Sequence, residues 1–281
     1  MTAGVQRLGL MGGEWAKLAA FVRRDFLVAW SYRMSFVSDL LSLVSLTVVF
    51  YFVGLLVDGS KLPTYDGTRV SYLEFAVVGI ALGLFMQLGL DRVARAVRNE
   101  QLMGTLESLL LTPTSSSTLQ AGSVAFDLLY VPVRTAVFLL AISLAFGLHF
   151  EPGGLLPAIA ILLAFIPFVW GLGVASAATI LTFRRGGGLI ATAALGLALL
   201  SGVYFPIDLL PDWLVGVAEH NPVALAIEGM REALLGGAGW GDVLPSIGVL
   251  CAMALVSLAL GQAAFRAALR REQRLGTLGL Y

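Results

Sequence analysis

Long apolar stretches alternate with short polar segments along almost the whole chain. A membrane-spanning α-helix needs about 20 mostly apolar residues to cross the hydrocarbon layer. Six stretches approach or exceed this length, and they cover residues 34–57, 72–90, 119–146, 155–183, 189–205 and 243–265. The pattern therefore predicts an all-α, polytopic membrane protein with six transmembrane helices.

Composition supports the bilayer as the solvent of this chain. Of its 281 residues, 58% are hydrophobic and 13% are charged, whereas soluble domains carry about 25% charged residues. The formal net charge is zero, so no basic field indicates a nucleic-acid partner. The single cysteine, Cys251, excludes an internal disulfide.

The segment before the first apolar stretch has the pattern of an amphipathic helix. Its apolar residues recur at spacings of three or four, which builds one apolar stripe; they are Trp15, Leu18, Val22, Phe26 and Trp30. Lys17 and Arg24 fall on the far face. Such a helix is expected to lie in the membrane interface, against lipid headgroups. A plain cytoplasmic extension is the alternative.

Basic residues are distributed unequally between the two sides that six spans create. One side carries Arg7, Lys17, Arg23, Arg24, Arg33, Arg92, Arg95, Arg98, Arg184, Arg185, Arg266, Arg270, Arg271 and Arg274. The other side carries only Lys61, Arg69 and Arg231. Because cytoplasmic loops carry the excess of Lys and Arg, both termini are expected in the cytoplasm. The predicted units are a cytoplasmic or interfacial segment 1–33, a membrane domain 34–265 and a tail 266–281.

Catalytic and metal-binding signatures are missing. A P-loop needs Gly-Lys followed by Ser or Thr, and neither Lys17 nor Lys61 has that context. His149 and His220 lie far apart in the sequence, and no His/Cys cluster has metal-ligand spacing. We therefore expect no metal and no cofactor on this chain.

A polar and apolar segment separates the second and third apolar stretches. Residues 91–118 form this predicted coupling region, and Glu100–Leu111 is expected to be a separate helix with one apolar face. Pro113 and the serines after it would end the helix. A helix with one apolar face can bind in the groove of a partner protein, or it can lie on lipid.

Two motifs resemble one family. Residues 100–113 are similar to the pattern E-x-x-x-G-T-L-E-x-L-x-x-T-P of ABC-2 type transporter permeases, through Glu100, Gly104, Thr105, Leu106, Glu107, Leu109, Thr112 and Pro113. The segment after the fifth stretch also resembles that family, through Ser201, Gly202, Phe205, Pro206, Leu210, Pro211, Trp213, Leu214, Asn221, Pro222 and Arg231.

The resemblance implies a permease subunit that works with a separate ATP-binding subunit, which would hold ATP and Mg²⁺. It implies that Glu100, Gly104, Thr105, Leu106, Glu107, Thr112 and Pro113 couple the two subunits. It also implies a second permease copy, identical or related, and a bacterial inner membrane. Export by alternating access would follow, with a drug, a lipid or a lipid-linked glycan as an amphipathic substrate.

The outer loop, residues 206–242, is expected to form two short helices separated at Asn221 and Pro222. A re-entrant pair that caps the exit is one interpretation, because irregular backbone is tolerated in a membrane where protein or water surrounds it. An interfacial loop anchored by Trp213 and Trp240 is the other.

Three charges fall inside predicted spans, where charge is costly and often functional. Asp39 lies in the first span, and Asp127 and Arg134 lie on one face of the third. A structural pair between helices and a role in the transport path both remain open. If the two aspartates bound ions, the chain would be a secondary transporter driven by an ion gradient. An integral membrane enzyme is a further alternative.

Overall fold

The computed structural model describes residues 19–275 except 21, 25, 28–30, 32, 60–61, 103, 105–115 and 184–185. Its long helices are α2 (Arg33–Gly54), α3 (Tyr72–Leu102), α5 (Ser116–Phe146), α6 (Leu155–Thr182) and α10 (Trp240–Leu275). Its shorter elements are β1 (Thr64–Tyr65), β2 (Thr68–Arg69), η2 (Pro152–Gly154), α7 (Gly187–Leu199), η3 (Ile207–Leu209), α8 (Asp212–Glu219) and α9 (Pro222–Gly236). The two strands pair antiparallel.

Each of the six predicted apolar stretches contains a helix, which confirms a predominantly helical protein with the character of a polytopic membrane protein. Three helical segments are long and apolar enough to cross a membrane: Tyr72–Asn99, Pro152–Thr182 and Trp240–Leu275. Three shorter apolar segments accompany them among the described residues: Leu41–Gly54, Pro132–Phe146 and Gly187–Leu199.

The fifth stretch, predicted as a span over residues 189–205, ends earlier than expected. Helix α7 stops at Leu199 after 13 residues, which rise only about 20 Å. Gly202 then adopts a φ of 66°, a left-handed conformation that breaks the helix. The prediction was wrong at this end because residues 201–206 form a turn that binds a distant side chain, as described below.

Helix α3 continues beyond its predicted end, so Glu100 does not begin a separate helix. Residues 91–102 extend α3 without a break, and residues 266–275 extend α10 in the same way. Both extensions bury apolar side chains in one cluster that includes residues of α6, the helix that each of them contacts. This cluster includes Val93 and Val97 of α3, Val174 and Leu181 of α6, and Phe265, Ala268 and Leu269 of α10. Mutual burial explains why both helices persist past their apolar stretches.

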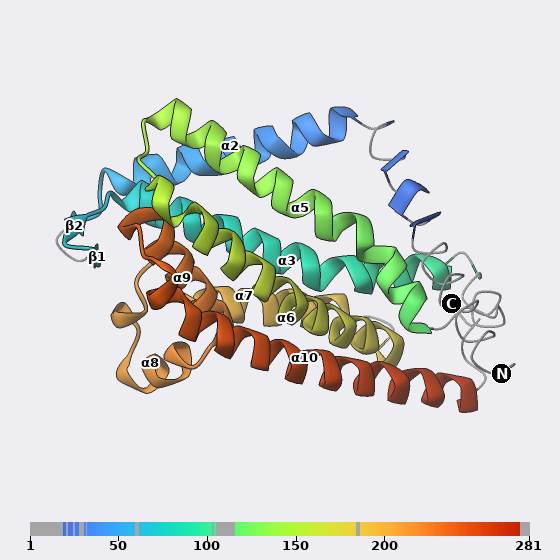
Figure 1. Cartoon of the computed structure of the whole chain (residues 1–281). Helices are drawn as coiled ribbons and strands as arrows, with labels where there is room; N and C mark the ends of the chain where they lie inside the picture. Colours follow the sequence, from blue (N-terminus) through green and yellow to red (C-terminus); the bar gives the residue numbers. More distant parts are fainter. Residues whose placement is uncertain are drawn as a thin grey trace, which may run out of the picture.

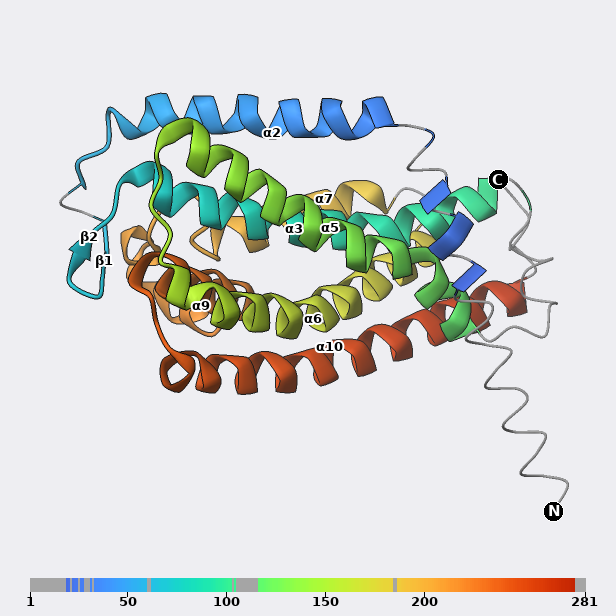
Figure 2. The same cartoon turned by 45° about the horizontal axis from the view of Figure 1, so that its top comes forward.

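Helix α3 lies at the centre of the molecule (Figures 1 and 2). In its most apolar window 72% is buried, against 39% for α6 and 22% for α10. The hairpin β1–β2, α8 and α9 gather at one end, here the hairpin end, while α3 and α10 finish at the opposite end, here the arginine end (Figure 1).

Glycines bring the backbones of the long helices together. A side chain at Gly171 of α6 would collide with Ser257 of α10, and one at Gly261 would collide with the carbonyl of Gly171. A side chain at Gly89 of α3 would likewise collide with the side chain of Val169 of α6. All three glycines therefore serve contacts within the chain, as is common where helices approach closely in membranes.

Candidate functional site

The hairpin end contains a buried arginine, Arg231, on α9. This helix forms where the sequence supplies both of its ends. The side chain of Asn221 accepts a hydrogen bond from Val223 N at 3.0 Å, and Pro222 occupies the first turn, as is favoured at helix N-termini. Gly237, with a φ of 66°, closes the other end. Arg231 points into the protein and is only 2% exposed.

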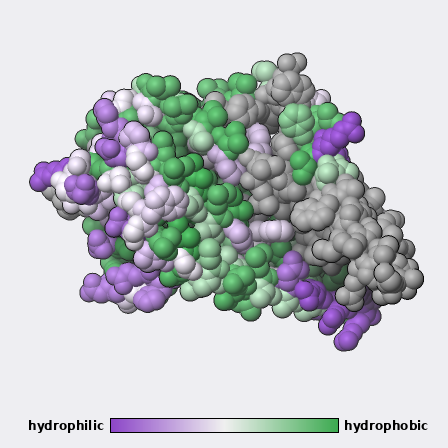
Figure 3. Space-filling view, viewed as in Figure 1, coloured by the Kyte–Doolittle hydropathy of each residue, from purple (hydrophilic) through white to green (hydrophobic). Residues whose placement is uncertain are grey.

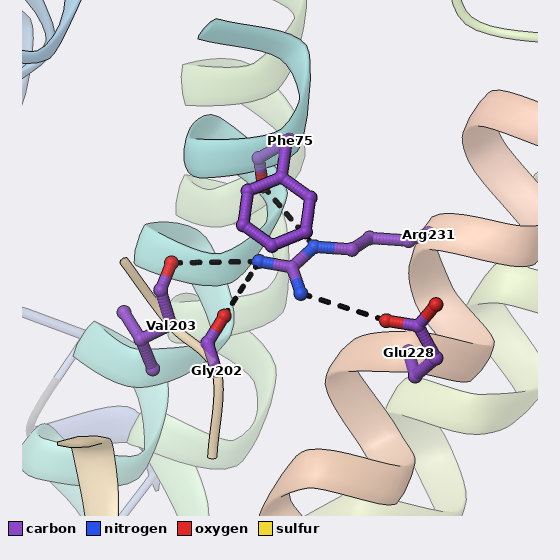
Figure 4. Close-up of polar contacts among 5 residues, drawn as sticks. All are labelled: Phe75, Gly202, Val203, Glu228 and Arg231. Atoms are coloured by element: carbon purple, nitrogen blue, oxygen red, sulfur yellow. Dashed lines mark hydrogen bonds and ion pairs between the residues drawn. The ribbon is translucent and has the colours of Figure 1, made fainter. Parts of the chain in front are cut away.

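The guanidinium of Arg231 joins α9, α3 and the turn after α7 (Figure 4). Its Nε donates to the carbonyl oxygen of Phe75 at 3.1 Å, and its Nη2 donates to the carbonyl oxygens of Gly202 at 2.8 Å and Val203 at 3.4 Å. Its Nη1 lies 3.6 Å from Glu228 Oε2. We call these five residues, Phe75, Gly202, Val203, Glu228 and Arg231, the Arg231 network.

An aromatic ring completes the surroundings of the guanidinium. The Cζ atom of Arg231 lies 3.4 Å from the centroid of the Phe75 ring, within the range of a cation–π interaction. Gly79, one helical turn along α3, has no side chain at a point where a Cβ would collide with Val203 O and Arg231 Nη2. The network can therefore form only because position 79 is glycine.

A second polar link supports the turn. Asn221 Nδ2 donates to Ser201 Oγ at 2.8 Å, so the residue that caps α9 also holds the end of α7. Tyr72 Oη donates to the carbonyl oxygen of Tyr204 at 3.0 Å, which attaches the same turn to the start of α3. The turn is thus bound to α3 and to α9, and its carbonyls are fixed toward Arg231.

Burial sets the electrostatics of the network. It lowers the pKa of Arg231, while Tyr65 and Glu228 act in the opposite direction. The guanidinium stays charged, because arginine is the most basic side chain and is not deprotonated in proteins. Burial, and then Glu228, raises the pKa of Tyr65 beyond its usual range. A buried charge is tolerable where its donors are satisfied, and here the three carbonyls and Glu228 provide the partners.

A pocket of about 170 Å³ lies next to the network, between α2, α3 and α7. Helix α7 contributes small side chains, among them Ala194 and Ala198, and α3 contributes Gly83 and Gln87. Val203 borders both regions, because its carbonyl accepts from Arg231 while its side chain lines the pocket. Most lining residues are apolar, but polar and apolar atoms contribute almost equally to the pocket surface, so the pocket suits a ligand that carries both kinds of group.

The structure brings together only part of the predicted outer-loop set. Asn221, Pro222 and Arg231 belong to the connected polar region, and Pro206 is buried while Phe205 is half-buried. Pro211 is exposed, and Trp213 on α8 is 76% exposed, so neither contributes to the network. Both predicted short helices exist; α9 is largely buried, whereas the one buried residue of α8 is Ala218. Arg231, which the charge distribution places on the outer side, is buried.

The predicted coupling residues lie at the arginine end. The backbone of Glu100 belongs to the last turn of α3, and Gly104 follows with a φ of 68°. Gly104 N donates to the carbonyl oxygen of Gln101 at 3.0 Å, which turns the chain away from α3. The remaining residues of the set lie outside the described residues: Thr105, Leu106, Glu107, Thr112 and Pro113.

The other predicted residues are distributed along the bundle. Trp15, Lys17 and Trp30 lie outside the described residues, and Arg24 is helical and exposed. The backbone of Asp39 lies in α2, and those of Asp127 and Arg134 lie in α5. Arg134 is half-buried. The groups of three or more acidic, histidine or cysteine side chains that a metal ion needs do not occur within the described ranges.

Sequence reasoning missed Phe75 and Glu228 as partners of Arg231. Glu228 stands three residues from Arg231 and could have been found from helical spacing. Phe75 lies 156 residues away, and it contributes a backbone carbonyl, which every residue has. Local sequence therefore gave no sign of that contact.

The sequence of this chain is similar to those of known proteins, and the similarity shows its family. It is 26% identical over 202 residues to the linearmycin resistance permease protein LnrN of Bacillus subtilis (strain 168), a match that covers 72% of this chain and 52% of that protein. The chain thus spans about half the length of the curated relative it matches. The family model described as ABC-2 type transporter matches residues 16–235. Because this match covers most of the chain, the protein belongs to the ABC-2 type transporter family.

Proposed function

We propose that this chain is the permease subunit of an ATP-binding cassette exporter, driven by a separate subunit that binds and hydrolyses ATP with Mg²⁺. The observation that carries this proposal is the continuity of α3. One uninterrupted helix joins the Arg231 network at Phe75 to the predicted coupling segment at Glu100. A displacement of the coupling segment by the ATPase would therefore reach the hairpin end through a single helix.

The substrate proposed is amphipathic: a drug, a lipid or a lipid-linked glycan. The pocket between α2, α3 and α7 supports this class, because apolar side chains line it together with Gln87 and Tyr204 and its surface is almost equally polar and apolar. The printed name of the Bacillus subtilis relative concerns linearmycin resistance, which agrees with an amphipathic compound only as an analogy. Two permease copies would face each other across the path, and alternating access would move the substrate outward.

The arginine end is proposed to face the cytoplasm of a bacterium, with both termini on that side. Arg92, Arg95 and Arg98 on α3 and Arg266, Arg270, Arg271 and Arg274 on α10 support this orientation. Cytoplasmic segments close to spans carry the excess of basic residues.

The experiment is co-purification of the full chain with candidate ATPase subunits, followed by ATPase and transport assays in lipid nanodiscs and vesicles. Glu107→Arg is expected to lose the ATPase or to uncouple hydrolysis from transport. Glu219→Arg on α8 makes the same charge change at the hairpin end and serves as the control. Transport that follows a proton gradient without ATP, and that is lost in Asp39→Asn/Asp127→Asn, would contradict the proposal.

A further inference from the structure

The extension of α10 at the arginine end presents a row of basic side chains. Arg266, Arg270 and Arg274 recur every fourth residue, so they follow one side of the helix. All three are exposed. Among the residues that the structure describes, none of the three forms an ion pair with a carboxylate. Their guanidinium groups are therefore available to an anionic partner.

The same side of α10 continues into the apolar part of the helix. At 3.6 residues per turn, Leu255 and Ala259 lie within about 20° of Arg266 around the helix axis. Leu255 is 72% exposed, and Ala259 and Ala263 are exposed as well. Ala259 and Ala263 have small side chains, so they leave a shallow strip on the surface of α10 between Leu255 and the arginines. In Figure 3 the apolar surface and the polar tip of α10 are adjacent.

The depth of the arginines fits lipid headgroups. Measured from Phe265, the last residue of the apolar stretch, the helical rise places Arg266 about 2 Å, Arg270 about 8 Å and Arg274 about 14 Å further along the axis. The headgroup layer is about 5–8 Å thick on each side of the hydrocarbon. Arg266 and Arg270 therefore lie at headgroup depth, whereas Arg274 lies beyond it.

We propose that α10 binds an anionic phospholipid, with its phosphate between Arg266 and Arg270 and an acyl chain along Ala259 and Ala263. Guanidinium groups bind phosphate oxygens through paired, charge-assisted hydrogen bonds. A lipid suits this surface better than an ATPase, because α10 is the least buried of the three long apolar helices and the arginines continue its lipid-exposed side. The site is independent of ATPase coupling, so either proposal can fail while the other holds.

The test is native mass spectrometry of the full chain, titrated with phosphatidylglycerol and, separately, with phosphatidylcholine. Each arginine near an anionic surface strengthens binding about five-fold, so Arg266→Gln/Arg270→Gln is expected to weaken phosphatidylglycerol binding about 30-fold. Phosphatidylcholine binding should not change. Arg274→Gln is the matched control, because it removes the same charge from the same side of α10 beyond the headgroups, and it should retain most of the affinity.

The single variants Arg266→Gln and Arg270→Gln, each expected to lose about five-fold, replace the double variant if it does not fold. Unchanged phosphatidylglycerol affinity in these variants would overturn the proposal. An equal loss in Arg274→Gln would also overturn it, since it would indicate a diffuse attraction to the whole basic extension. If the double variant kept phosphatidylglycerol but lost a co-purified ATPase, the surface would be a protein-docking site and the lipid proposal would be wrong.

Discussion

Arg231 and Phe75 contact each other twice. The Nε of Arg231 donates to the Phe75 carbonyl oxygen at 3.1 Å, and its guanidinium carbon lies 3.4 Å from the centroid of the Phe75 ring. The first contact fixes the plane of the guanidinium, and the second covers one of its faces. Helix α9 is thereby attached to the start of α3, the most buried of the three long apolar helices.

Arg231→Ala is expected to destabilise the protein strongly. It would leave the carbonyls of Gly202 and Val203 without a donor in a buried turn, and each buried polar group left unsatisfied costs about 1–3 kcal/mol. Arg231→Lys should recover only part of the loss, because a single ammonium cannot reproduce the planar fork. Thermal unfolding in detergent, followed by tryptophan fluorescence, measures both variants. Arg69→Gln, at an exposed position on β2, is the control, and an Arg231→Ala melting temperature equal to that of wild type would contradict this role.

Gly79→Ala and Gly196→Ala should have opposite effects. A methyl group at position 79 would collide with Val203 O and Arg231 Nη2, and such overpacking costs about 1–3 kcal/mol. Position 196 on α7 has open space around it, so alanine there should stabilise the helix by about 0.5–1 kcal/mol. Both melting temperatures are compared with wild type in one detergent. Equal effects of the two substitutions would show that Gly79 is not required by the network.

Asn221→Ala removes a helix cap and a link between helices at once. Loss of the cap should cost about 0.5–2 kcal/mol, and loss of the bond to Ser201 Oγ adds to it. A double-mutant cycle with Ser201→Ala separates the two contributions. We expect a coupling energy larger than the error of the unfolding measurement. Strict additivity of the two single variants would mean that the 2.8 Å contact does not contribute to stability.

The stability of the folded protein should depend on pH through Glu232. Burial, and then repulsion from Glu228 and Asp242, raises the pKa of Glu232. The folded protein therefore binds this proton more tightly than the unfolded chain, and this residue's contribution to stability increases as the pH falls through the raised pKa. Glu232→Gln should be more stable than wild type at neutral pH, and the difference should shrink as the pH falls toward the usual glutamate range. Thermal melts from pH 4 to pH 8 check this against Glu219→Gln, an exposed carboxylate on α8; a constant difference would contradict it.

The sequence alone predicted the elements that depend on composition and spacing. Apolar length fixed the positions of the six helical stretches, because a bilayer imposes its thickness on any segment that crosses it. The Asn221–Pro222 pair marked the start of α9, since caps act within a few residues. The two motifs, at residues 100–113 and 201–231, indicated the family before any geometry was considered.

Only the tertiary structure decided where α7 ends, how far α3 and α10 continue, and what Arg231 does. Each of these outcomes depends on partners that are distant in the chain. The carbonyl of Phe75 meets Arg231 across 156 residues, and the extensions of α3 and α10 persist because Val93 of α3 and Phe265 of α10 are buried in a cluster that includes α6. A hydrophobic pattern records which side chains avoid water, but not which of them meet. The physical reason is that helix ends inside a bundle are set by packing and by the satisfaction of buried polar groups, and both depend on contacts between helices.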